Sequence, residues 1–160
     1  MNRPRPPVEL VPASARRPAR WMRRLFDRGA PRARMVAPPE VRLGERLEVE
    51  WGLDCPEGDL VSVRVALVGT EIARQHLSAR TGISVVSETS DFVDVELARV
   101  PAAGLRIATG RASGVVPARA VPSLAGRHNE IAWALVVEAT FVAAPALRES
   151  FPLVVSSGVA

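Results

Sequence analysis

The sequence predicts an all-β protein, an antiparallel β-sandwich preceded by a disordered basic leader with one short amphipathic helix. Three observations support this fold class. From residue 41 onward apolar residues recur at every second position in several short segments, turn-forming residues separate these segments, and no long helical pattern occurs among them. Strands with one apolar and one polar face are typical of two antiparallel sheets packed face to face. We therefore place the leader at residues 1–38 and the sandwich domain at residues 39–160.

Proline and charge distinguish the leader from the rest of the chain. Eight of the fourteen prolines lie in residues 1–39, which excludes a continuous helix or a central strand there. Residues 1–34 hold ten Arg against Glu9 and Asp27, a net charge of +8, whereas the remaining residues hold eleven Arg against fifteen acids, a net charge of −4. We expect the leader to be flexible and basic, and the sandwich to be mildly acidic.

One segment of the leader has a helical pattern. Residues 19–28 follow Pro18, which suits a first helical turn, and precede Gly29 and Pro31, which end a helix. On a helical wheel an apolar arc of Trp21, Met22, Leu25 and Phe26 lies opposite an arc of Arg20, Arg23, Arg24, Asp27 and Arg28. A helix this short is marginal in water, so we expect it to fold against another surface.

We predict that this segment docks, through Arg20, Trp21, Met22, Arg23, Arg24, Leu25, Phe26 and Arg28. A groove on a protein partner would take the apolar anchors, and an acidic partner would supply the counter-charge. An anionic membrane surface fits the same pattern. Nucleic acid is supported only by the density of Arg, because the sandwich is acidic and no nucleic-acid-binding fold pattern occurs. Alternatively, the leader is disordered or packs back on its own sandwich.

The first two predicted strands alternate clearly. Apolar residues occupy every second position in the runs Leu47, Val49, Trp51, Leu53 and Val61, Val63, Val65, Leu67. Residues 54–59 lie between the runs and contain Pro56 and Gly58, which predicts a hairpin loop that joins the two strands. Trp51 has the apolar phase of its strand, so we expect it in the core.

The later strands follow the same rule. Residues 69–80 fit a strand and a short helix equally well, and 83–86 is a weak strand candidate. The clear strands have apolar runs of Val93, Val95, Leu97, then Ile131, Trp133, Leu135, Val137, Ala139, Phe141, and finally Phe151, Leu153, Val155. We expect Trp133, like Trp51, to lie in the core.

Residues 114–155 resemble the arrestin-like superfamily. A proline-flanked segment from Gly114 to Pro117 leads to the turn Pro122-Ser123, and a strand that alternates around Trp133 follows. Upstream, residues 41–47 and 65–71 are similar to strand starts of the same fold. The resemblance implies a single sandwich of the arrestin/immunoglobulin-like type, similar to bacterial sporulation-control proteins and the retromer arrestin-like subunit. It also implies a non-catalytic scaffold that binds other macromolecules, and no binding residue is carried over from the family.

We find no catalytic or metal-ligating pattern in the sequence. His128 and Glu130 have the H-x-E spacing of a zinc deaminase, but no P-C-x-x-C follows, and His76 has no partner at ligand spacing. The acidic run Asp54, Glu57 and Asp59 is too short for a calcium loop. Cys55 lies in the same acidic run, which disfavours the thiolate. We expect no enzyme, no cofactor and no metal.

The location and role follow from these patterns. Because Cys55 is the one cysteine, the chain cannot form an intramolecular disulfide. Most cytosolic proteins likewise lack disulfides. The N-terminus lacks the apolar stretch of a signal peptide. The longest weakly charged run, 131–147, is interrupted by Glu138 and Pro145 and is too short for a transmembrane helix. We expect a cytoplasmic, single-domain binding or scaffold module, with peripheral membrane association as an alternative location. A structural accessory subunit of a larger complex is the alternative role.

Overall fold

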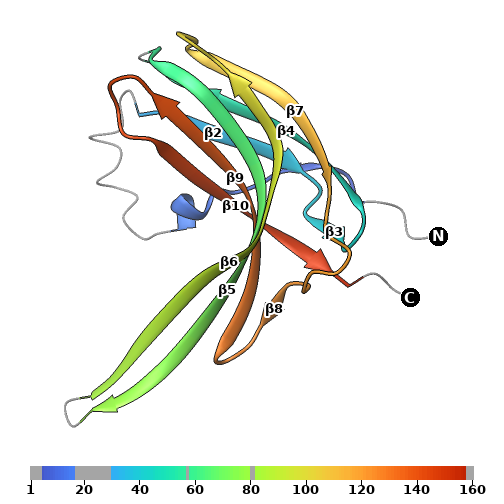
Figure 1. Ribbon diagram of the computed structural model, residues 1–160, viewed down its shortest axis with the longest axis vertical. Coiled ribbons are helices and arrows are strands. Elements are labelled where there is room, and N and C mark those ends of the chain that lie inside the picture. Colours follow the sequence, from blue (N-terminus) through green and yellow to red (C-terminus); the bar gives the residue numbers. More distant parts are fainter. Residues whose placement is uncertain (1–4, 17–29, 57, 80–81, 158–160) are drawn as a thin grey trace.

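The computed structural model describes residues 5–16, 30–56, 58–79 and 82–157 (Figure 1). These ranges hold no α-helix. The elements are β1 (Val8–Glu9), the 3-10 helix η1 (Ala13–Arg16), β2 (Arg32–Ala37), β3 (Glu40–Arg42), β4 (Arg46–Asp54), β5 (Leu60–Ala79), β6 (Gly82–Pro101), β7 (Ile107–Val115), β8 (Leu124–Ala125), β9 (Asn129–Phe141) and β10 (Leu147–Ser156).

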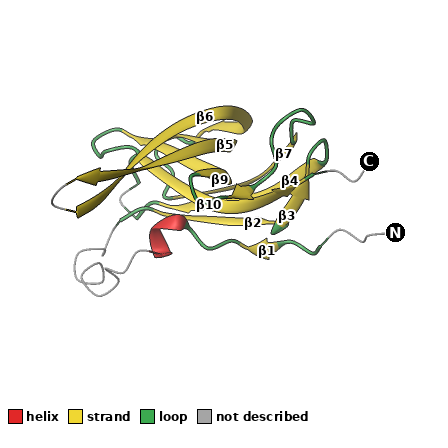
Figure 2. Cartoon of the chain, turned by 90° about the horizontal axis from the view of Figure 1, so that it is seen from below, coloured by secondary structure: helices red, strands yellow, loops and turns green. Residues whose placement is uncertain are grey.

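The strands form two sheets, which Figure 2 shows as two layers with β5 and β6 on one side and β2 on the other. The first sheet has the antiparallel order β1-β2-β4-β7. The second has the order β3-β10-β9-β5-β6, and β8 pairs with the start of β9. All of its pairs are antiparallel except β3 with β10. The predicted all-β sandwich is confirmed.

Alternating residues of both sheets fill the space between the layers. The main contributors are Leu47, Val49, Trp51 and Leu53 of β4, Trp133, Leu135 and Val137 of β9, and Phe151, Leu153 and Val155 of β10, all of which are buried. The prediction that both tryptophans lie in the core is therefore confirmed. The indole nitrogen of Trp133 donates to the Val121 carbonyl at 3.0 Å, whereas that of Trp51 is buried without a hydrogen-bond partner.

The prediction for the start of the second apolar run was wrong at one position. Leu60 is fully buried, and Val61, which we placed in the core, is 40% exposed. The pairing of β5 with β9 is irregular between Leu60 and Ser62, and this shifts the alternation by one residue. Periodicity cannot reveal such a shift because it assumes a regular strand.

The hairpin predicted at residues 54–59 was also wrong. β4 and β5 belong to different sheets, so this segment crosses between the layers instead of joining paired strands. The turn itself is present, since Gly58 has a φ of 74° and its N–H donates to the Cys55 carbonyl at 3.0 Å. Cys55 is buried, and the pKa of its thiol is raised first by burial and then by the charge of Asp54.

The boundary between leader and sandwich differs from the predicted one at residues 38/39. β2 pairs with β4 and buries Met35 and Ala37, so residues 32–37 belong to the sandwich. β1 pairs with β2, and Ser14 of η1 donates through its hydroxyl to Glu149 of β10 at 2.9 Å. The described parts of the leader therefore pack back on the sandwich. Its prolines exclude a long strand but permit short strands between them. The predicted helix at 19–28 lies outside the described residues.

The turn that carries the family resemblance completes the end of β10. β9 and β10 pair as far as Leu153, and beyond that point Ser123 takes the place of a β9 residue. The Ser123 N–H donates to the Val155 carbonyl at 2.7 Å, and the Val155 N–H donates to the Ser123 hydroxyl at 2.8 Å. One residue after Pro122 thus satisfies both backbone groups of Val155 on this side of β10.

We predict that Gly110→Ala destabilises the sandwich. A Cβ at position 110 would lie 2.8 Å from Cζ2 and 2.9 Å from Cε2 of the buried Trp51 ring, closer than side-chain atoms normally approach. We expect a loss of about 1–3 kcal/mol in the free energy of unfolding, measured with urea. Thr109→Ala, at an exposed position of the same strand, is the control and should stay within about 0.5 kcal/mol of wild type. Equal stability of the two variants would contradict this packing.

Candidate interaction surface

β5 and β6 extend beyond the sandwich as a two-stranded arm. β5 pairs with β9 as far as Ala73, opposite Asn129, whereas its pairing with β6 continues to Ala79, opposite Gly82. Figure 1 shows this pair projecting at the lower left, away from both sheets. We call residues 74–79 together with 82–91 the arm. Among the described residues, no third strand pairs with either of its edges.

The arm resolves two sequence segments that periodicity left open. Residues 69–79 are a strand, and the weak candidate at 83–86 is confirmed as part of the same strand as 93–97. The polar residues 87–90 made these look like two separate strands. In a ribbon with both faces in solvent, polar residues do not end a strand. Val85 and Val86, at 51% and 50% exposure, show that apolar residues on the arm are not buried either.

Aromatic packing attaches the base of the arm to the core. Phe92 packs edge-on against Trp133, with 5.6 Å between the ring centroids and an interplanar angle of 84°. Gly69 of β5 leaves room for both rings, because a Cβ there would lie 2.9 Å from Phe92 Cζ and 3.2 Å from Trp133 Cη2. The register of β5 and β6 shifts between Gly69 and Thr70, where Phe92 is the extra residue. The arm is thus continuous with the core at this bulge.

A polar contact supports the base from the side of β9. Arg74, the first residue of the arm, forms an ion pair with Glu130, and its backbone N–H donates to the His128 carbonyl at 2.6 Å. His128 and Glu130 are the pair with H-x-E spacing. Glu130 lies on β9, where its ion pair with Arg74 is a structural contact. His128 lies just before this strand. The described residues contain no group of three or more His, Cys, Asp or Glu that could hold a metal ion.

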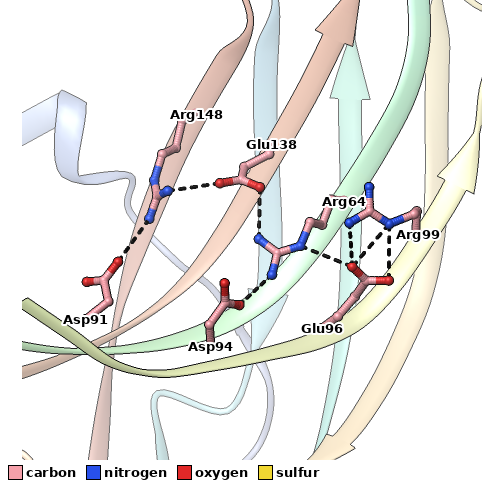
Figure 3. Close-up of polar contacts among 7 residues, drawn as sticks. All are labelled: Arg64, Asp91, Asp94, Glu96, Arg99, Glu138 and Arg148. Carbon is pink, nitrogen blue, oxygen red and sulfur yellow. Dashed lines mark hydrogen bonds and ion pairs between the residues drawn. The ribbon is translucent and has the colours of Figure 1, made fainter.

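An ion-pair network covers the outer face of the second sheet near this base, and we call it the Arg64 network (Figure 3). The Arg64 guanidinium contacts Asp94, donates from Nε to Glu96 at 3.1 Å and donates from Nη1 to Glu138 at 2.9 Å. Its side chain is 18% exposed. The pKa of Arg64 is raised, first by the hydrogen bond with Glu138 and further by those with Asp94 and Glu96, against the opposing effect of burial.

Two further arginines extend the Arg64 network. Arg148 donates to Glu138 at 2.9 Å and lies 3.9 Å from Asp91, while Arg99 donates to Glu96 at 2.6 Å. The seven side chains come from β5, β6, β9 and β10, so the network ties four adjacent strands together. Every arginine in it contacts a carboxylate. The network therefore serves as a brace for the sheet and offers no free cation to an anionic ligand.

The docking residues predicted from the sequence lie elsewhere in the chain. Arg20, Trp21, Met22, Arg23, Arg24, Leu25, Phe26 and Arg28 are outside the described residues. The segments on either side of them are held to the sandwich, by the contact of Ser14 with Glu149 and by β2. No helix in the described ranges has the length and apolar character needed to cross a membrane. The arm was not predicted from the sequence, although one feature pointed to it: residues 60–101 contain no proline until the last position.

The two sheets and the Ser123 turn define a single arrestin-type β-sandwich. The structure is similar to the crystal structure of Spo0M, a sporulation control protein from Bacillus subtilis, with a TM-score of 0.53 and 10% sequence identity. The match covers 81% of this chain and 51% of Spo0M, so the chain spans about half the length of that protein. The predicted resemblance is thereby confirmed at the level of the fold. No protein-family model and no curated protein sequence matches this chain.

We predict that Arg64→Met destabilises the sandwich by about 1–2 kcal/mol at pH near 7, because it leaves a cluster of carboxylates without its central cation. Urea unfolding measures the loss. Arg111→Met is the matched control, since Arg111 forms one exposed ion pair with Glu50 and should contribute about 0–0.5 kcal/mol. Equal effects of the two substitutions would show that the Arg64 network does not brace the sheet.

Wild type and Arg64→Met should also differ in their response to acid. The pKa of Glu96 is lowered, first by the hydrogen bond from Arg99 and then by that from Arg64, with burial opposing both. A lowered carboxylate pKa stabilises the fold above the unfolded pKa, and this contribution is lost as the pH falls through the folded pKa. The stability difference between wild type and Arg64→Met should therefore shrink below about pH 4. A difference that is constant down to acid pH would contradict the electrostatic origin.

Proposed function

We propose that this chain is a non-catalytic binding module that engages a macromolecular partner through its arm. The observation that supports this most is the pair of unpaired strand edges beyond Ala73. A two-stranded ribbon is marginally stable by itself in water. An added strand would satisfy its free N–H and C=O groups and cover its exposed valines.

The distal edge of β6 lacks lysine, proline and bulges, three of the features that usually prevent strand addition, although it carries the acidic residues Glu88 and Asp91. Natural edge strands are protected by lysine, proline, bulges or short length. Residues 82–91 contain no Lys, Arg or Pro, and their register with β5 is continuous from Gly82 to Asp91. The bulges of this hairpin occur only nearer the sandwich, at the Gly69/Thr70 and Val65/Ala66 shifts. The distal edge is therefore regular enough to accept an extended segment.

A structural accessory subunit of a larger complex would use the same edge. The two roles differ in the autonomy of the fold. The two sheets share one continuous core, and its aliphatic and aromatic residues are buried without a second chain. We therefore favour an independent module, which unfolds in a single cooperative transition when purified alone. An accessory subunit would unfold without cooperativity in isolation.

The basic leader supplies a second docking element. Because Ser14 and β2 hold the flanking segments on the sandwich, a partner bound to residues 20–28 would be kept near the domain. A protein groove that takes Trp21 and Phe26, with an acidic rim for the arginines, fits this segment best. An anionic membrane surface is the alternative for the same residues.

We predict that a proline on the free edge of β6 prevents capture of the partner. Adjacent residues of a strand direct their N–H groups to opposite edges, so one of Val86→Pro and Ser87→Pro removes a free donor and the other breaks the β5–β6 ladder. Thermal unfolding identifies the variant that leaves the hairpin intact. That variant should lose the partners that wild type retains in affinity purification. An unchanged set of partners would overturn docking at this edge.

We predict that Trp21→Ala combined with Phe26→Ala abolishes capture of the partner that binds the leader, because both aromatic anchors of the predicted helix are removed. Affinity purification of the full chain measures this, and flotation with anionic and neutral liposomes separates membrane from protein docking. Arg3→Ala with Arg5→Ala, which reduces charge outside residues 19–28, is the control. If the arginine variant loses the partner while Trp21→Ala with Phe26→Ala retains it, charge alone and not the aromatic anchors would explain binding.

A further inference from the structure

We propose that the strand added to β6 is an extended basic segment of another protein, an inference that rests on the proposed binding role of the arm. The middle of the free edge of β6, from Glu88 to Glu96, is acidic. Residues 82–98 contain Glu88, Asp91, Asp94 and Glu96 and no Arg or Lys. All four carboxylates are on exposed residues. A neighbouring strand would therefore lie next to a row of negative charge.

Part of this charge has no counter-charge within the described residues. Glu88 of β6 and Glu71 of β5 form no ion pair there. In the Arg64 network four carboxylates face three guanidinium groups, which leaves one negative charge in excess. Asp91 has the weakest compensation, since it lies 3.9 Å from Arg148 and accepts a hydrogen bond of 2.7 Å from the Thr70 hydroxyl. Glu88 and Asp91 are thus the two carboxylates of the edge that remain available to a partner.

The register of the arm places these charges relative to the exposed valines. Glu88 lies opposite Ala73 and Val86 opposite Gln75, so Glu88 and Val86 are successive side chains on one face. Asp91 lies opposite Thr70 and Val85 opposite His76, and both belong to the other face. Each face of the ribbon therefore offers one valine toward the tip and one carboxylate toward the base.

This arrangement defines the sequence pattern of the partner. An antiparallel strand beside β6 would place cations opposite Asp91 and Glu88 and an apolar pair opposite Val86 and Val85. From its N-terminus, the partner segment would have a cation, two residues of any kind, a second cation, one residue of any kind and then two apolar residues. Arg-Ser-Thr-Arg-Ser-Val-Val is the simplest such segment. Because β6 of a second copy carries the same carboxylates, like-charge repulsion between the two strands disfavours it as the occupant.

Fluorescence anisotropy with the full chain and labelled peptides tests this proposal. One peptide carries Arg-Ser-Thr-Arg-Ser-Val-Val, and its matched counterpart has both arginines replaced by glutamate. We expect the basic peptide to bind, with an affinity that falls as salt is raised, and the acidic peptide to bind about tenfold more weakly. Glu88→Lys combined with Asp91→Lys should reverse this preference. Glu9→Lys combined with Glu48→Lys, at exposed positions of the other sheet, is the matched control and should leave the preference unchanged.

Glu88→Lys alone keeps the test valid if Asp91→Lys disturbs the arm through Thr70, and it should weaken binding of the basic peptide about threefold. Equal binding of both peptides, lost in the proline variant with an intact hairpin, would keep docking at this edge and overturn the basic partner. A dimer that depends on the same edge and excludes the basic peptide would assign the edge to a second copy and overturn it too. Failure of both peptides to bind, together with proline variants that retain every partner, would overturn the proposed function itself.

Discussion

The structure depends on one long strand that is paired on both sides for most of its length and on one side at its end. From Ser62 to Ala73, β5 lies between β9 and β6, and its inward side chains Val63, Val65 and Leu67 enter the core. Beyond Ala73 the pairing with β9 stops, and within the described ranges no other strand pairs with the ribbon. The sandwich and the Arg64 network lie where β5 is paired on both sides, and the arm lies where it is paired on one side. An edge that is closed in the sandwich becomes open in the arm.

The two faces of β5 have different tasks. Its inward residues Val63, Val65 and Leu67 contribute apolar burial, which provides most of the stability of a domain of this size. Its outward residue Arg64 contributes little apolar burial. The ion pairs of Arg64 instead connect β5 with β6 and β9, and through Glu138 with β10. Exposed ion pairs are weak individually, so the value of this network lies in its span across four strands at the base of the arm.

The similarity to Spo0M concerns the fold alone, so the binding properties of this chain depend on its own residues. Those residues distribute charge unevenly. The leader is strongly basic, whereas the free edge of β6 is acidic between Glu88 and Glu96, so the two proposed docking elements have opposite charge. Unlike charges on separate elements favour distinct partners, because a segment that complements one element is repelled by the other.

The sequence by itself determined the fold class, the inward phase of most strands, and the burial of Trp51 and Trp133, because a two-residue period directly reports which face of a strand is apolar. Only the tertiary structure decided which strands are neighbours. It placed residues 32–37 in a sheet, separated β4 from β5 where a hairpin was predicted, and exposed Val61 through an irregular pair. The arm belongs to the same category. β5 loses its neighbour beyond Ala73 because β9 begins at Asn129, opposite that residue. The pairing of residues so far apart in the sequence does not affect the local period of either strand.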